Sequence, residues 1–152
     1  MKIEEVIKTA TAIDLPTKTV INLMYTTRVM EEAVSAILKE YDLTTPQYNV
    51  LRILRGQKGT PASLSCIQER MVDKNSNTTR LVDKLIKKAY ADRRICPHNR
   101  RMVEIIITED GLEILKTLDP ITKETNAKML GNLADKEIET LNNLLDKIRT
   151  HE

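Results

Sequence analysis

The sequence predicts a mainly α-helical fold with one basic β-hairpin. The spacing of the apolar residues, the apolar fraction and the length of the chain support this class. Apolar residues recur at helical spacing along most of the 152 residues, whereas the alternation typical of a strand occurs in Met102–Thr108. The predicted order is helix, helix, short helix, helix, hairpin, helix, helix. An apolar fraction of 41% is enough to build one core, and the length suits a single domain spanning 1–152.

The first long helix is predicted from an apolar stripe between Thr19 and Tyr41. Pro16 lies close to its start, where the missing N–H of proline removes no helical hydrogen bond. A second helix begins at TTPQ, because Pro46 suits a first turn, and it ends before the glycines and proline of RGQKGTP. The stripe of the first helix comprises Val20, Leu23, Met24, Met30, Val34, Ile37, Leu38 and Tyr41.

A short helix and a longer one are predicted next. The short helix is SLSCIQERM, with Ser63 and Ser65 as alternative N-caps. After the tight link VDKN, the segment NSNTTRLVDKLIKKAY predicts a helix over Asn75–Tyr90, with Asn75 or Ser76 as its cap. The buried side of this helix is formed by Leu81, Val82, Leu85 and Ile86.

The stretch RRICPHNRRMVEIIIT predicts a basic hairpin, and two further helices follow it. Its strand, Met102–Thr108, places Val103, Ile105 and Ile107 on one face, which should pin the hairpin to the core. The segment TEDG begins a helix that we expect to continue past Pro120 with a kink. The last helix follows ADKE and carries Ile138, Leu141, Leu144, Leu145 and Ile148.

The net charge of +2 conceals a strong asymmetry. From Val50 to Arg101 the chain has thirteen basic and four acidic residues, a balance of +9, whereas the rest has eleven and eighteen, a balance of −7. A polyanionic partner explains this segregation better than simple solvation of a helix face. The lack of Phe and Trp, with only four Tyr, argues against binding of RNA or single strands by stacked aromatics.

The short helix, tight turn, polar-headed helix and basic hairpin together describe a winged helix-turn-helix. The head of the longer helix, NSNTTR, carries short hydrogen-bonding side chains and one arginine. Such residues contact phosphates or base edges in the major groove, and arginine binds guanine through two hydrogen bonds. An ordinary capped surface helix is the alternative, and the neighbouring basic hairpin is what favours DNA.

The ordered segments LTTPQYNVLRIL, SLSCIQERM, NTTRLVDKLIKKAY and the DRR…NRRMVEIIIT wing that ends in TEDG resemble the MarR family of bacterial transcription regulators. The resemblance extends from about Thr19 to the C-terminus. It implies a homodimeric regulator, most often a repressor, that binds double-stranded DNA at a pseudo-palindromic operator. It also implies a DNA-binding lobe at 46–108 and dimerisation helices at 1–42 and 110–152.

The resemblance further implies that a small amphipathic or aromatic ligand binds between the dimer helices and the DNA-binding lobe. Met24, Tyr25, Met30 and Tyr48 either line such a pocket or belong to the core, so the ligand-binding residues stay unassigned. The expected DNA-binding residues lie in the helix head and the wing. They are Ser76, Asn77, Thr78, Thr79, Arg80, Lys84, Arg93, Arg94, Arg100 and Arg101.

Two positions depart from the pattern of the family. The family's Asp-x-Arg of the wing matches Asn99, Arg100 and Arg101, so Arg101 would enter the minor groove. Asn99 supplies no charge where the family has an acid, and a weaker anchor is therefore expected. The family also tends to have glycine after the recognition helix; with Ala89 there, a left-handed cap is less expected.

Metal binding and catalysis have little support in the sequence. Cys96 and His98 provide only two possible ligands, and Cys66 and His151 lie far away along the chain. No nucleophile-base arrangement or phosphate loop occurs, so we expect no enzyme, no metal and no cofactor. Two alternatives stay open: a redox-sensing regulator acting through Cys66 or Cys96, and a winged helix that binds proteins without reading DNA.

No membrane partner is expected. No apolar run approaches the roughly eighteen residues that a transmembrane helix needs. The N-terminal MKIEEVIKTA has acidic residues where a signal peptide would be apolar. The sequence therefore predicts a cytoplasmic protein.

Overall fold

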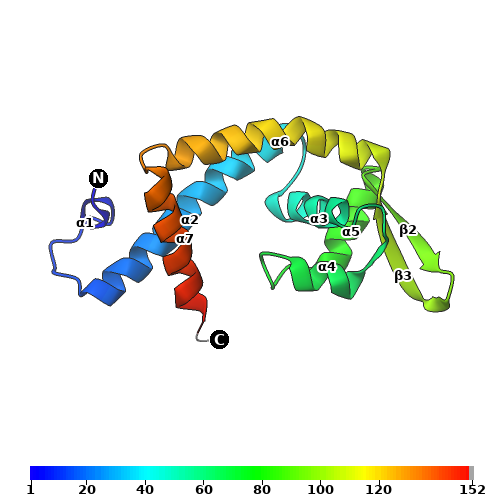
Figure 1. Ribbon diagram of the computed structural model, residues 1–152, viewed down its shortest axis with the longest axis horizontal. Coiled ribbons are helices and arrows are strands. Elements are labelled where there is room, and N and C mark those ends of the chain that lie inside the picture. The colour runs from blue at the N-terminus through cyan, green and yellow to red at the C-terminus, as the bar shows by residue number, and fades with distance from the viewer. Residues whose placement is uncertain (151–152) are drawn as a thin grey trace.

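The computed structural model describes residues 1–150, and two long helices connect its two ends (Figure 1). These helices, α2 (Leu15–Glu40) and α6 (Glu109–Leu130), pack against each other. One end carries the winged lobe, residues 45–107. At the other end α1 (Ile3–Val6) packs on α2, and α6 turns into α7 (Asp135–Arg149). Within residues 1–150, no helix combines the length and the apolar character needed to cross a membrane.

The winged lobe contains three helices and a small antiparallel sheet, which confirms the predicted winged helix-turn-helix. The strand order in the sheet is β1–β3–β2. The helices are α3 (Thr45–Gly56), α4 (Leu64–Arg70) and α5 (Thr78–Lys87), and the strands are β1 (Ala62–Ser63), β2 (Ala91–Cys96) and β3 (Asn99–Ile107). The sequence did not predict β1 or α1, because elements of two and four residues are too short to show periodicity.

The starts of α2 and α3 follow from their caps. Asp14 accepts a hydrogen bond from the Thr17 N–H at 3.0 Å, so α2 begins before Thr19, and Pro16 lies in its first turn as predicted. This bond lowers the pKa of Asp14 below its ordinary value. The cap therefore stabilises the fold above that ordinary pKa, and its contribution is lost as the pH falls through the lowered pKa. Pro46 occupies the first turn of α3, which also has a capping box.

The helix α5 begins at Thr78, so the prediction of a start at Asn75 or Ser76 was wrong. The Asp73 carboxylate accepts from the Asn75 N–H at 2.9 Å, and the Asp73 carbonyl accepts from the Ser76 N–H at 3.2 Å. These bonds hold the preceding segment in a turn. Asn77 is the cap, because its Oδ1 accepts from the Arg80 N–H at 3.1 Å. In α4, Ser63 rather than Ser65 is the cap.

The expectation against a left-handed residue after α5 was also wrong, since Ala89 has φ +60°. The Tyr90 N–H donates to the Leu85 carbonyl at 3.0 Å, and the Ala89 N–H donates to the Ile86 carbonyl at 2.9 Å. This pair of bonds satisfies carbonyls at the end of α5. It offsets the roughly 1–2 kcal/mol that a left-handed conformation costs a residue with a Cβ.

The core of the winged lobe is continuous with the long helices. Ile105 is fully buried, while Val103 and Ile107 are half-buried against the same core, which confirms the predicted inward face of the strand. The helix that begins at TEDG does continue through Pro120, as predicted. Fully buried side chains come from α2, α3, α4, α5, β3 and α6, and include Leu38, Val50, Leu51, Ile67, Val82, Leu85, Ile105, Leu115 and Leu118.

Gly111 allows α6 to approach the base of the wing. A Cβ at this position would lie 2.2 Å from the Tyr90 carbonyl oxygen and 2.7 Å from Ile107 Cγ1. The same carbonyl accepts from the Thr108 N–H at 3.1 Å, and Thr108 caps α6. The glycine of TEDG is therefore required by contact with backbone, which has little freedom to shift.

We expect Gly111→Ala to lower the free energy of unfolding by about 2–3 kcal/mol, because overpacking against backbone forces α6 away from the wing. Urea denaturation at fixed protein concentration measures the change. Gly56→Ala is the control, since a Cβ there meets nothing within 4 Å, and it should be neutral or stabilise by up to about 1 kcal/mol. Equal effects of the two substitutions would contradict the role of Gly111.

Candidate nucleic-acid interface

The head of α5 presents three of the predicted residues to solvent. Asn77, Thr79 and Arg80 are exposed at the first turn, where the free N–H groups of the helix also lie. Thr78 is different, because it is only 6% exposed and its hydroxyl donates to Gln68 Oε1. Ser76 is half-buried with its Oγ turned away from solvent. The outward surface of the head is therefore narrower than the sequence predicted.

Gln68 of α4 organises this head, and sequence reasoning missed it. Its Oε1 accepts from Thr78, and its Nε2 donates to the Lys74 carbonyl at 2.8 Å. Through these two hydrogen bonds, the Gln68 side chain connects α4 to the turn before α5 and to the first residue of α5. Contacts between two helices across a turn leave no periodic signal in a sequence, so only the structure identifies Gln68.

Lys84 lies one helical turn beyond Arg80. It lines a small hollow of 380 Å³ together with Lys39 at the end of α2, Asp42 and Lys88. Lys88 is paired with Asp42 there. Lys84 is exposed and also borders the α2–α3 connection, while its spacing of four residues places it on the same face of α5 as Arg80.

Two of the four wing arginines are bound to carboxylates. Arg93 contacts Asp83 of α5 at 2.5 Å, and Arg94 contacts Glu104 across the hairpin at 3.0 Å. Both pairs are partly exposed, so each contributes at most about 1 kcal/mol to stability. Their more important effect is geometric, because the Arg93 pair holds the wing against the recognition helix.

Arg100 and Arg101 are the wing cations left for a partner. Both are exposed, and the structure of residues 1–150 gives neither an ion pair. They follow the Pro97–His98 turn, where the register shifts from Cys96↔Asn99 to Ile95↔Val103, so residues 100–102 have no ladder partner. The free arginines therefore lie on the protruding part of the hairpin (Figure 1).

Asn99 holds the backbone of Arg101 rather than its guanidinium. Its Oδ1 accepts from the Arg101 N–H at 3.1 Å. The asparagine thus still orders the chain at the arginine, although it lacks the charge of the family's acid. Cys96 and His98 lie beside Pro97 in this part of the hairpin. Within residues 1–150, no group of three or more His, Cys, Asp or Glu side chains is placed to hold a metal ion. His151 lies outside that range.

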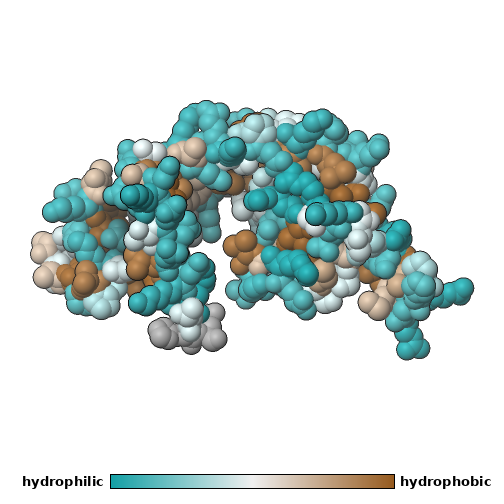
Figure 2. All heavy atoms as spheres, viewed as in Figure 1, coloured by the Kyte–Doolittle hydropathy of each residue, from teal (hydrophilic) through white to brown (hydrophobic). Residues whose placement is uncertain are grey.

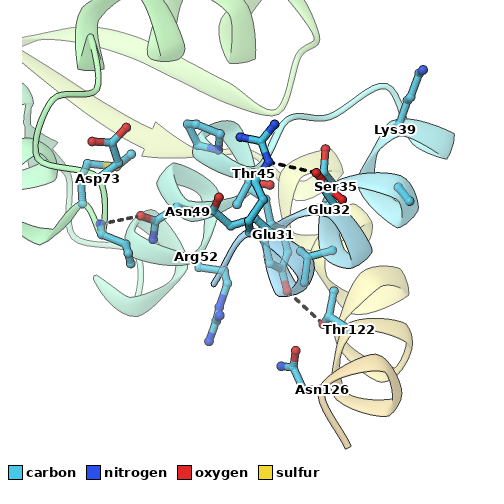
Figure 3. Close-up of a pocket in the computed structure, with 17 residues that line it drawn as sticks. Glu31, Glu32, Ser35, Lys39, Thr45, Asn49, Arg52, Asp73, Thr122 and Asn126 are labelled. Atoms are coloured by element: carbon cyan, nitrogen blue, oxygen red, sulfur yellow. Dashed lines mark hydrogen bonds and ion pairs between the residues drawn. The ribbon is translucent and has the colours of Figure 1, made fainter. Parts of the chain in front are cut away.

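A groove of 840 Å³ lies where the winged lobe meets the long helices (Figure 3). Its walls come from α2, α3, α6 and the turn 71–73 before α5. Tyr48 lines it, whereas Met24, Tyr25 and Met30 do not. The Tyr48 hydroxyl is 3.2 Å from Thr122 Oγ1 in α6, and the guanidinium of Arg52 lies 5.7 Å from the Tyr48 ring centre.

The wall of this groove is bonded to the helix-turn-helix. Asn49 of α3 lines the groove, and its Oδ1 accepts from the Val72 N–H at 2.9 Å (Figure 3). Val72 belongs to the turn that leads into α5. A molecule bound in the groove would therefore touch residues that also set the position of the recognition helix.

The end of the molecule away from the winged lobe exposes apolar side chains (Figure 2). No residue of α7 is buried, although the helix is amphipathic. Exposed apolar residues on α2 are Leu15, Val20, Met24, Tyr25 and Val29, and those on α7 are Leu141, Leu144 and Ile148. An amphipathic helix without a buried face is a candidate surface for contact with another protein chain.

Comparison with known proteins agrees with this architecture. The MarR family model matches residues 43–103. The transcriptional repressor IacR of Pseudomonas putida is 27% identical over 112 residues, which cover 74% of this chain and 66% of IacR. The regulator PecS of Dickeya dadantii is 23% identical over 81% of this chain and 75% of PecS.

Solved structures extend the similarity to nearly the whole chain. BpsR of Bordetella bronchiseptica, whose DNA binding is regulated by 6-hydroxynicotinic acid, is 18% identical with a TM-score of 0.80 over 92% of this chain and 99% of BpsR. A MarR transcription factor from Planctomyces limnophilus is 30% identical with a TM-score of 0.66, over 90% of this chain and 98% of that protein. The chain belongs to the MarR family of transcription regulators.

Proposed function

We propose that the protein is a homodimeric repressor that binds a pseudo-palindromic duplex operator and responds to a small ligand. The observation that carries this proposal is the pairing of an exposed polar helix head with free arginines on the wing of the same lobe. In this proposal residues 46–108 bind DNA, while 1–42 and 110–152 form the dimer. The basic charge of the central segment and the acidic flanks support the same division.

Each proposed contact has a specific role. Asn77, Thr79 and Arg80 would face the major groove, where Arg80 can bind guanine through O6 and N7. Arg100 and Arg101 would follow the adjacent minor groove, whose potential is most negative where A·T pairs narrow it. Arg93 and Arg94 would act indirectly, by holding the wing through their carboxylate partners. Thr78 would not contact DNA, because its hydroxyl donates to Gln68.

We expect Arg101→Ala to weaken binding to duplex DNA without unfolding the protein. Arg80→Ala should also relax base preference, at a cost of about 1–3 kcal/mol for a two-bond contact. Gel-shift titrations over a range of salt concentrations measure both effects, because log affinity falls linearly with log salt.

The control for these variants is Lys116→Ala on α6, which removes one charge from an exposed position outside the winged lobe. It should leave the affinity within about twofold and the salt slope unchanged. If Arg101→Ala and Arg80→Ala bind like the parent at every salt concentration, DNA reading by this surface is ruled out. A winged helix that binds only proteins would give that result.

The dimer is proposed from the uncovered faces of α2 and α7. Leu144 is 53% exposed and Ile148 is 56% exposed, so more than half of each residue is left uncovered in the single chain. Two-fold symmetry would cover these faces and present two recognition helices about 34–36 Å apart, which matches one turn of DNA. The alternative is that these side chains only cover the core of one chain. No residue of α7 is buried, so the structure of the single chain does not favour this alternative.

We expect Leu144→Glu to convert the dimer to a monomer, because it places a charge in an apolar interface. Analytical ultracentrifugation should show about half the parent mass, and DNA affinity should fall with it. Asn143→Glu adds the same charge at the neighbouring exposed position and should stay dimeric. A dimeric Leu144→Glu variant would place the interface elsewhere.

The ligand site is proposed in the groove that contains Tyr48, Asn49 and Arg52. Regulation of BpsR by 6-hydroxynicotinic acid supports a small aromatic acid as the class of ligand, since the Arg52 guanidinium that lines the groove suits a carboxylate. Binding would change DNA affinity only if the ligand prefers one arrangement of the winged lobes over another.

A redox response is the second candidate, and one contact favours it. Cys66 is half-exposed in α4, and Arg70 donates to its Sγ at 3.0 Å. Reactive cysteines typically lie in partly exposed positions beside cationic side chains. Oxidation of Cys66 would disturb the helix that carries Gln68.

We expect peroxide to reduce DNA binding if this candidate holds, and Cys66→Ser to abolish that response because the thiol is gone. Cys96→Ser, at the other half-exposed cysteine, is the control and should keep the response. Gel shifts after peroxide treatment, with mass spectrometry of both thiols, measure the outcome. If peroxide leaves the DNA binding of the parent protein unchanged, redox sensing is ruled out.

A further inference from the structure

The face of the wing that looks toward α5 ends in an exposed isoleucine. Ile95 is 65% exposed and is paired directly with Val103, so the two side chains share one face of the hairpin. Arg93 and Ile105 form another pair on this face. Because Arg93 contacts Asp83 of α5 and Ile105 is fully buried, this face is the one turned toward the recognition helix.

The surroundings of Ile95 are basic, which makes an apolar side chain there unusual. Within the hairpin it is followed by the Pro97–His98 turn and by the free arginines Arg100 and Arg101. An exposed apolar side chain at a protruding tip does not stabilise the single chain, because apolar area is stabilising only when it is buried. A partner that combines phosphates for the arginines with an apolar surface between them fits both properties.

The minor groove of duplex DNA is such a partner. Its rims are phosphates, its walls are the sugars, and its floor can be opened when an apolar side chain is pushed between base steps. Isoleucine is one of the residues that proteins insert in this way. Residues 100–102, which include both free arginines, lie between Asn99 and Val103, and Val103 is the ladder partner of Ile95. The arginines and the isoleucine therefore belong to the same end of the hairpin.

We propose that Ile95 enters the minor groove beside Arg101 as an apolar wedge, which adds a contribution to DNA affinity that does not depend on salt. The inference rests on the proposed DNA binding and assigns to the wing a second, uncharged mode of contact. It follows that the bound site should favour easily unstacked steps such as TA and CA at the position under the wing.

The test compares Ile95→Thr with Met102→Thr. Threonine keeps the β-branching that suits a strand while removing apolar area. Met102 is 46% exposed on the same hairpin, and alternation along β3 places it on the face opposite Val103 and Ile95. The probe is a duplex of roughly 30 base pairs, long enough for two half-sites, that the unmodified protein enriches from a random pool.

Ile95→Thr should bind this duplex about five to twenty times more weakly at every salt concentration, with an unchanged slope of log affinity against log salt. Met102→Thr should stay within about twofold of the parent, and Arg101→Ala should reduce the slope by about one per wing. A 2-aminopurine probe placed under the wing should brighten with the parent and not with Ile95→Thr, because the wedge unstacks the step.

The other outcomes separate the inference from the proposed function. Parental affinity of Ile95→Thr for the duplex would overturn the wedge and leave DNA binding intact. A change of slope in Ile95→Thr would also overturn it, because the isoleucine would then act by placing phosphate contacts. A parent protein that enriches no duplex would overturn the proposed function, and the wedge with it.

Discussion

The position of the winged lobe depends on the packing of α3 against the middle of α6. Leu115 and Leu118 of α6 are fully buried, and each such side chain contributes about 2–3 kcal/mol through apolar burial. The Arg55–Asp119 pair is partly exposed and contributes at most about 1 kcal/mol, as does the net Tyr48–Thr122 hydrogen bond. Apolar packing therefore contributes more to the stability of this joint than the polar contacts do.

The same joint connects the proposed interface to the proposed dimer. α6 begins against the base of the wing at Gly111, continues across α3, and then leads into α7, which carries the uncovered apolar face. The groove at this joint touches Asn49, whose side chain holds the turn before α5. In the proposed dimer, a change in the packing of α3 on α6 would alter the separation of the two copies of α5 without unfolding either lobe.

The sequence was sufficient for those parts of the fold that repeat or that carry a local signal. Helical spacing predicted the long helices, alternation predicted the inward face of β3, and Pro16 and Pro46 marked helix starts. The inward turn of Thr78 and the pairing of Arg93 with Asp83 depend on contacts between separate elements, which no local pattern records. Ala89 shows the same limit, because hydrogen bonds at the end of α5 outweigh the preference of alanine for negative φ.

The central claim is that a two-fold dimer sets the spacing of two recognition helices through this joint. It is tested most directly by the distance between spin labels at Lys87→Cys, at the exposed last turn of α5 and away from the proposed base contacts, in a variant whose Cys66 and Cys96 are replaced by serine. On a duplex enriched by the protein, we expect one narrow distance near the helical repeat, about 34–36 Å. The absence of dipolar coupling, or a broad distribution that DNA does not narrow, would contradict it.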